Sequence, residues 1–96
     1  MDAVTLDSTL VVHPRVSIRP EPFGALLYHF GTRQLSFLKD LMLLEVVQAC
    51  DGTRTLDEAL AVAGVPDAHI ERYRRAVATL VRSTMLQQHA ASEVAA

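Results

Sequence analysis

The sequence predicts an α+β fold, winged helix-turn-helix-like, in which a three-stranded antiparallel sheet is followed by three helices. Two observations carry this prediction. Up to Leu38, apolar residues alternate in short runs that Gly and Pro separate, which is typical of strands. From Asp40 onward, the apolar spacing becomes helical, and capping residues bound each run.

The expected strands are "VSIRPE", "GALLYHF" and "RQLSFL", at residues 16–21, 24–30 and 33–38. Proline ends the first strand because it cannot donate to a sheet. Gly31 opens a three-residue turn between the other two, because glycine adopts a positive φ without steric cost, so these strands form a hairpin. Alternation places Leu35 and Phe37 on one face, and we expect that face to lie on the core.

The first expected helix follows Asp40, a good N-cap, and its segment "LMLLEVVQAC" is apolar almost all round, which predicts burial on most sides. Thr55 and Glu58 form a capping box that starts a second, short helix, which Gly64 ends. Asp67 is the expected N-cap of the third helix. The apolar residues of this helix fall on one face: Ile70, Tyr73, Val77, Leu80 and Val81.

The length of 96 residues fits one domain, which we expect at residues 16–88, between a flexible lead-in (1–15) and a flexible tail (89–96). The net charge of −2 argues against nucleic acid and membranes as partners, because bulk positive charge is missing. A single cysteine forms no internal disulfide, and the chain shows neither a signal peptide nor a membrane span. These features predict a cytoplasmic protein.

No motif predicts catalysis. The four histidines lack the spacing of metal ligands, and there is no glycine-rich nucleotide motif. Cys50 ends a helix that is expected to be buried, so a small core thiol is the favoured interpretation over a nucleophile. The sequence therefore predicts a protein that is not an enzyme and needs no metal or cofactor of its own.

Two features remain as candidate binding surfaces. The third strand is an edge of the predicted sheet, and an edge either stays unpaired or adds a partner strand. On the last helix, Arg72, Arg75 and Arg82 share a broad face while Arg74 points elsewhere. Such a basic face is an ordinary solvated surface, a contact for DNA phosphates, or a contact for an acidic peptide.

Strand addition alone provides little affinity. About four or five backbone hydrogen bonds contribute about 0.5–1.5 kcal/mol each, while ordering a flexible peptide costs about 1 kcal/mol or more per residue. Side-chain contacts beside the strand are therefore required. The last helix would supply them as the second wall, with apolar contact from Tyr73, Ala76, Thr79 and Leu80.

The order of the elements, "FGTRQLSFL" before an apolar helix, "ACDGTRTLDEA" and the final helix together resemble the PqqD-like peptide chaperones, the recognition elements of ribosomally made, modified peptides. The likeness spans about residues 16–86. Through "HPRVSIRPEPFGALLYHF" the chain is most similar to the mycofactocin biosynthesis chaperones within that family. The resemblance implies a winged-helix-like domain that binds the leader of a precursor peptide by strand addition and delivers it to a radical S-adenosylmethionine enzyme.

The resemblance also implies which residues contact the peptide. They are Arg33, Gln34, Leu35, Ser36, Phe37 and Leu38 on the strand, and Arg72, Tyr73, Arg75, Ala76, Thr79 and Leu80 on the helix. Two alternatives stay open: a winged-helix DNA-binding protein that reads DNA with its last helix, and a subunit that docks on an enzyme without touching a peptide. A homodimer is also open, because an unpaired strand edge can pair with a second copy.

Overall fold

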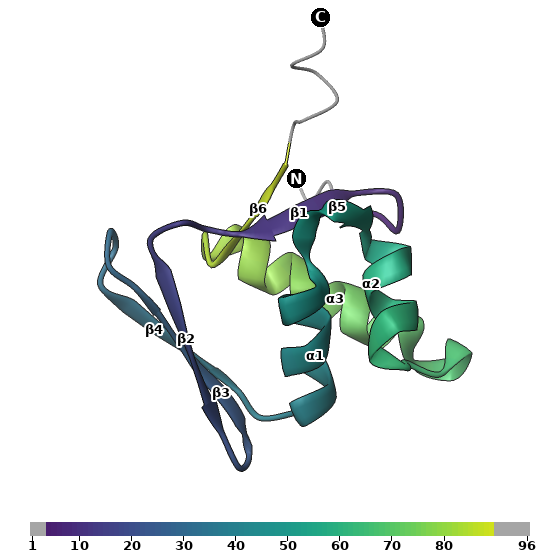
Figure 1. Ribbon diagram of the computed structural model, residues 1–96, viewed down its shortest axis with the longest axis horizontal. Helices are drawn as coiled ribbons and strands as arrows, with labels where there is room; N and C mark the ends of the chain where they lie inside the picture. Colours follow the sequence, from purple (N-terminus) through teal and green to yellow (C-terminus); the bar gives the residue numbers. More distant parts are fainter. Residues whose placement is uncertain (1–3, 90–96) are drawn as a thin grey trace, which may run out of the picture.

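The computed structural model describes residues 4–89 and shows an α+β fold with antiparallel sheets and three α-helices (Figure 1). The elements in chain order are β1 (Thr9–Val12), β2 (Val16–Glu21), β3 (Gly24–His29), β4 (Gln34–Leu38), α1 (Leu41–Ala49), β5 (Asp51–Thr55), α2 (Leu56–Ala63), the 3₁₀ turn η1 (Asp67–His69), α3 (Ile70–Arg82) and β6 (Leu86–Gln88). The predicted fold class is confirmed at this level.

The predicted three-strand meander is present, with the strand order β2-β3-β4. Its turn differs from the expectation. Four residues, 30–33, connect β3 to β4, and the positive φ of 63° falls on Arg33 rather than on Gly31. Glycine at position 31 has another reason: a Cβ there would lie 2.8 Å from the His29 ring, closer than real side-chain contacts.

The prediction of a single sheet is wrong. A second sheet with the order β5-β1-β6 lies where α1 ends and α2 begins (Figure 1). Strand β1 lies inside the segment that the sequence assigned to a lead-in, where it pairs antiparallel with β5 through Thr9 and Thr55, and with β6 through Val12 and Leu86. The local sequence hides this sheet because β5 reads "DGTRT", with no apolar alternation, and β6 has only three residues. The winged helix-turn-helix description is not confirmed.

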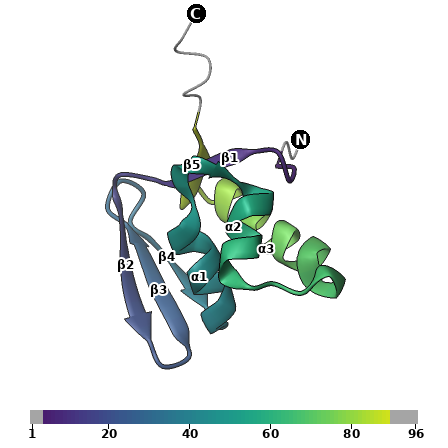
Figure 2. The ribbon, with the colours of Figure 1, turned by 45° about the vertical axis from the view of Figure 1, so that its right-hand side comes forward.

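The core lies around α1, which stands between the β2-β3-β4 sheet and α2 (Figure 2). Val46 and Val47 of α1 are fully buried, as the apolar character of that segment predicts. Leu27 of β3 and Leu60 of α2 close the core from either side. No helix within residues 4–89 is long and apolar enough to cross a bilayer.

Two of the three predicted helix starts are confirmed. Asp40 Oδ1 accepts hydrogen bonds from the N–H groups that follow it at the start of α1, and Thr55 and Glu58 form the reciprocal capping box of α2. The prediction for the third helix is wrong. Asp67 lies in the first position of η1 and caps nothing, because Pro66 starts a 3₁₀ turn that precedes α3.

The predicted inward orientation of Leu35 and Phe37 is also wrong. Their side chains are 57% and 59% exposed, whereas Leu38 is buried. The register explains this, because Ser36 and Leu38 lie opposite the buried residues Leu27 and Ala25 of β3. Leu35 and Phe37 therefore project from the opposite, outer face of the sheet. The predicted tail beyond residue 89 lies outside the described residues.

Candidate functional site

Strand β4 is an edge of the β2-β3-β4 sheet. One hydrogen bond shows which residues of β4 turn their N–H and C=O groups to the open edge. On the side of β3 that faces β2, the Phe30 N–H donates to the Arg15 carbonyl at 2.8 Å. In an antiparallel sheet, bonding directions alternate, so every second residue of β3 faces β2 and the residues between them face β4. In this pattern Pro20 and Ala25 form a pair without hydrogen bonds, which agrees with the missing N–H of proline. The register then leaves the N–H and C=O groups of Leu35 and Phe37 directed to the open edge.

The side chains of the same two residues form an apolar outer face. Leu35 lies opposite Tyr28 and Phe37 lies opposite Leu26, so each exposed side chain has an apolar neighbour on β3. The Tyr28 ring also packs edge-on against Phe30, with ring centroids 4.8 Å apart. Residues 35 and 37 thus offer both open backbone groups and exposed apolar surface.

Helix α3 is bonded to the segment after β4 and shares a pocket with the turn before β4. After the strand, the Tyr73 hydroxyl donates to the Asp40 carboxylate, with 2.5 Å between the oxygens. Before the strand, Thr32 of the β3–β4 turn and Val81 of α3 line the same pocket. The early part of α3 is therefore bonded to the residue two positions after β4, and the late part faces the β3–β4 turn across the pocket. We call the edge of β4 together with α3 residues 72–79 the β4–α3 surface.

The sequence-predicted contact residues divide into three groups by their exposure. Seven of them are exposed: Arg33, Gln34, Leu35, Phe37, Arg72, Arg75 and Thr79. Ser36 and Ala76 are half-buried, while Leu38, Tyr73 and Leu80 are at most 7% exposed and belong to the core. The exposed residues belong to two elements, β4 with the residue before it and α3, and the Tyr73–Asp40 hydrogen bond links α3 to the segment that follows β4.

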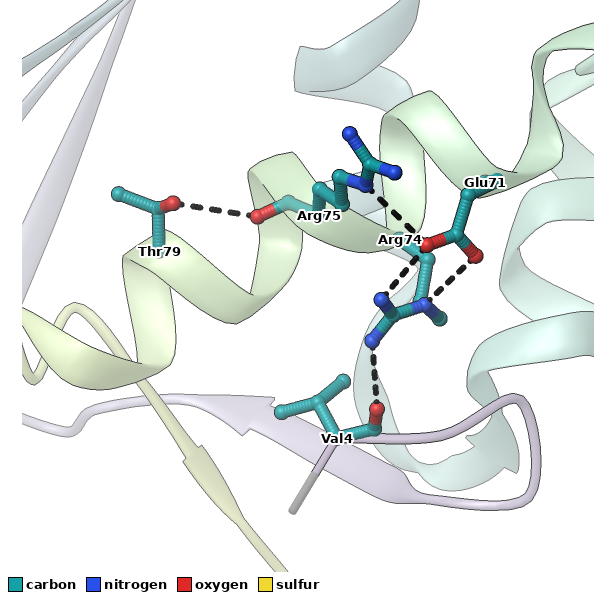
Figure 3. Close-up of polar contacts among 5 residues, drawn as sticks. All are labelled: Val4, Glu71, Arg74, Arg75 and Thr79. Atoms are coloured by element: carbon teal, nitrogen blue, oxygen red, sulfur yellow. Dashed lines mark hydrogen bonds and ion pairs between the residues drawn. The ribbon is translucent and has the colours of Figure 1, made fainter. Parts of the chain in front are cut away.

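The charge of α3 is partly neutralised by Glu71. Its carboxylate binds both the Arg74 guanidinium (2.9 and 2.7 Å) and the Arg75 Nε (3.2 Å), as Figure 3 shows. Arg74 also donates to the Val4 carbonyl at 2.8 Å, so its guanidinium points toward the segment before β1, whereas the Arg75 guanidinium does not (Figure 3). The bond from Arg74, followed by that from Arg75, holds the pKa of Glu71 at about 2. Arg75 pairs with Glu71 through its Nε, yet its side chain is 75% exposed. Its guanidinium is therefore also accessible to a partner.

Arg72 lies at the junction of α3 and the end of β4. Its guanidinium is 5.4 Å from the centre of the Tyr73 ring and 3.9 Å from the Asp40 carboxylate. Partial burial by itself raises the pKa of Asp40, but the bond from Tyr73, the two capping amides and Arg72 outweigh burial and hold this pKa below its usual value. The Asp40 bond, in turn, raises the pKa of the Tyr73 hydroxyl. Asp40 is therefore a charged acceptor at neutral pH and ties the two walls together.

The one cysteine is a core residue, as expected. Cys50 is 3% exposed, and burial, with the nearby Asp51 carboxylate, raises the pKa of its thiol to about 11. A thiol with that pKa carries almost no nucleophilic thiolate at neutral pH. Residues 4–89 contain no group of three or more His, Cys, Asp or Glu side chains that could hold a metal ion.

Sequence reasoning missed the pocket beside the β3–β4 turn. It contains His13, Arg15 and His29, and the two imidazole rings lie 4.3 Å apart. The pocket is assembled from segments that are distant in the sequence, including β6, which the sequence did not predict. No spacing of the residues along the chain could have revealed it.

Comparison with known proteins identifies the family. A sequence model of the peptide chaperone MftB family matches residues 9–87. The chain is 51% identical over 75 residues to the peptide chaperone MftB of Mycobacterium tuberculosis, which covers 78% of this chain and 69% of the relative. It is also 51% identical over 75 residues to peptide chaperone MftB of Mycolicibacterium smegmatis, covering 78% of this chain and 74% of that relative.

The corresponding protein of Mycobacterium ulcerans is 48% identical over 75 residues, covering 78% of this chain and 69% of the relative. No solved structure matches the chain. The matched region runs from β1 to β6 and so includes both sheets and all three helices. The resemblance predicted from the sequence is confirmed, and the chain belongs to the peptide chaperone MftB family.

Proposed function

We propose that this chain is a peptide chaperone for mycofactocin-type maturation, which binds the leader of a ribosomally made precursor peptide as an added strand on β4. The name of its relatives, peptide chaperone, supports a peptide partner. The observation that carries the mode of binding is the open edge of β4, where the backbone groups of Leu35 and Phe37 are directed outward. An extended peptide can bond to such an edge whatever its side chains are.

The second wall makes the interaction selective. Backbone bonds of about 0.5–1.5 kcal/mol each barely offset the cost of ordering the peptide, so side-chain contacts decide the affinity. Leu35 and Phe37 supply apolar surface on one side of the added strand. Arg72 and Arg75 of α3 supply positive charge on the other, which attracts acidic side chains of the leader.

The proposed role after binding is delivery to a radical S-adenosylmethionine enzyme. The chaperone supplies no cofactor and no catalytic group; it holds the leader so that the part to be modified stays at high effective concentration near the enzyme. Such a role requires both partners to be bound at once and fits a cytoplasmic protein. A homodimer through β4 would compete with the leader, because both would use the same edge.

The direct test is calorimetric titration of the chain with a synthetic leader peptide of a mycofactocin-type precursor, and with a scrambled peptide of the same composition. The proposal expects saturable 1:1 binding of the leader only. Equal binding of both peptides would contradict recognition at a specific edge. A pull-down of the purified enzyme, with and without leader, then separates delivery from simple docking.

A parallel titration with duplex DNA tests the alternative of a DNA-binding protein. DNA binding would weaken steeply with salt, because each neutralised phosphate releases counterions. We expect no DNA binding, since Glu71 already pairs with two arginines of α3.

A further inference from the structure

A pocket of about 580 Å³ lies beside the β3–β4 turn, which leads into β4, and Val81 near the end of α3 also lines it. One wall comes from the segment before β2, with His13 and Arg15, and a second from the β3–β4 turn, with His29 and Thr32. The rest is formed by the end of α3 and by β6, where Thr84 contributes. A peptide strand that follows β4 toward its beginning would pass the mouth of this pocket.

Backbone N–H groups fix which ring nitrogen accepts a hydrogen bond in both imidazoles of the pocket. His29 is 3% exposed, and its Nδ1 accepts hydrogen bonds from the N–H groups of Gly31 (2.9 Å) and Thr32 (3.1 Å). His13 Nδ1 accepts from the Arg15 N–H at 3.0 Å. A nitrogen that accepts carries no proton, so in the neutral form of each ring the proton is on Nε2. Both rings therefore have an Nε2–H donor.

The Nε2–H of His29 is available to a ligand. Within residues 4–89 no protein group accepts a hydrogen bond from it. In the same part of the chain, no fully buried side-chain nitrogen or oxygen lacks a partner. The His29 Nε2 is therefore not fully buried. Because His29 lines the pocket, we infer that this nitrogen is reached through the pocket. A buried imidazole whose remaining donor opens into a pocket is suited to bind an acceptor.

The charges of the pocket select the kind of acceptor. Among the lining residues within 4–89, Arg15 is the one that is permanently charged, and none of them carries a carboxylate. The other polar groups of the wall include the hydroxyls of Thr32 and Thr84. Burial, followed by the nearby His13 and Arg15, lowers the pKa of His29, so this ring is neutral at neutral pH. One permanent cation and two imidazole N–H donors match a monoanion with two acceptor oxygens.

We propose that this pocket binds a carboxylate of the bound peptide, supplied by an acidic side chain or by the peptide's C-terminus. Arg15 provides the charge, and the Nε2–H groups of His13 and His29 provide directed donors. The inference rests on the proposed function in one respect, that the peptide brings the carboxylate. The pocket would then fix the register of the added strand, because a peptide displaced by one residue turns each of its side chains to the opposite face.

The first experiment tests the pocket without any precursor peptide. N-acetylglutamate α-amide carries a side-chain carboxylate and N-acetylalanine a terminal one, and N-acetylglutamine α-amide and N-acetylalanine amide are their neutral matches. We expect the carboxylates to shift the NMR signals of the His29 ring and the Thr32 amide in a saturable way, and the neutral compounds to leave them unchanged. Arg15→Gln should weaken this binding about tenfold, as expected for loss of a charge-assisted hydrogen bond. Arg19→Gln is the matched control, because Arg19 pairs with Glu21 on β2 and does not line the pocket.

Equal shifts from charged and neutral probes, or unchanged affinity in Arg15→Gln, would overturn the proposal. The second experiment uses the leader peptide, with each acidic residue changed in turn to its amide, and with an amidated C-terminus. The carboxylate in question is the one whose removal costs about tenfold in the wild type and less than twofold in Arg15→Gln. If the leader protects the β4 amides but no carboxylate couples to Arg15, the pocket proposal fails and the proposed function stands. If the leader does not bind at all, the proposed function fails.

Discussion

The Tyr73 hydroxyl donates to Oδ2 of Asp40 across 2.5 Å and joins α3 to the start of α1. Asp40 performs two tasks with its two carboxylate oxygens. Oδ1 caps α1 by accepting from the N–H groups of Met42 and Leu43, and Oδ2 holds α3 through Tyr73. Because Asp40 closely follows the end of β4, this bond sets the position of α3 relative to the open edge.

Removing the hydroxyl tests this contact. Tyr73→Phe should lower the free energy of unfolding by about 1–2 kcal/mol, because hydrogen bonds to charged groups contribute about 1.5–3 kcal/mol and Arg72 retains part of the interaction. Urea denaturation at pH 7 measures the change. Tyr28→Phe is the matched control, since within residues 4–89 the Tyr28 hydroxyl has no hydrogen-bond partner. Equal stability of the two variants would contradict the role given to Tyr73.

The same contact predicts a pH dependence. The folded-state pKa of Asp40 lies below its usual value, so its contribution to stability is fully present above the unfolded pKa of about 4 and is lost as the pH falls through the folded pKa. Glu71, with a pKa of about 2, titrates in the same acidic range and adds to the loss. Glu71 is the same in the wild type and in Tyr73→Phe, so a difference between their pH profiles reports on Asp40. Urea denaturation between pH 5 and pH 3 should show a larger loss in the free energy of unfolding for the wild type than for Tyr73→Phe. Parallel pH profiles of the two would refute the assignment to Asp40.

Two substitutions at Phe37 distinguish the contribution of its exposed side chain to leader binding from that of its edge-facing N–H. Phe37→Ala removes an exposed side chain, so stability should change by at most about 0.5 kcal/mol while leader affinity falls about tenfold. Phe37→Pro also removes the N–H that faces the edge and should weaken binding further. The sheet tolerates this proline because the lost N–H is not part of the β3–β4 ladder.

Two controls accompany these variants. Val62→Ala truncates another exposed side chain, 61% exposed on α2, and should affect neither stability nor binding. Circular dichroism of each variant establishes that the fold is retained. If Phe37→Pro binds the leader as tightly as Phe37→Ala, the N–H of residue 37 makes no bond to the peptide.

Glu71 limits the positive charge on α3. Glu71→Gln removes the carboxylate that holds Arg75, so affinity for an acidic leader should rise about two- to fivefold at low salt. Glu58→Gln is the comparison, because it removes the same charge from a residue that caps α2. Calorimetry at two salt concentrations measures both variants. An unchanged or reduced affinity in Glu71→Gln would show that Arg75 does not contact the peptide.

The sequence predicted the parts of the fold that local signals determine. The Thr55–Glu58 capping box and the Asp40 cap depend on residues three or fewer positions apart, and both are present. The β2-β3-β4 meander is also local, because hairpins join its strands. Each of these features is stabilised mainly by neighbours in the chain, which is why sequence patterns reveal them.

The remaining features depend on contacts between distant segments. Strand β1 owes its pairing to β5 and β6, neither of which alternates. The two faces of β4 could not be told apart by apolar content, since Leu35 and Phe37 are exposed while Ser36 shares a face with buried Leu27. The pocket with His29 likewise needs the end of α3 and β6 to form.

Amide hydrogen exchange along β4 tests the central claim most directly. In the free chain, the Leu35 and Phe37 amides should exchange fast because they face the open edge, while the Ser36 amide, which faces β3, exchanges slowly. Saturation with the leader peptide should slow Leu35 and Phe37 by at least about tenfold and leave Ser36 almost unchanged. If Leu35 and Phe37 keep their free-state rates while the leader is bound, the peptide does not add to the edge of β4, and the proposed mode of binding is wrong.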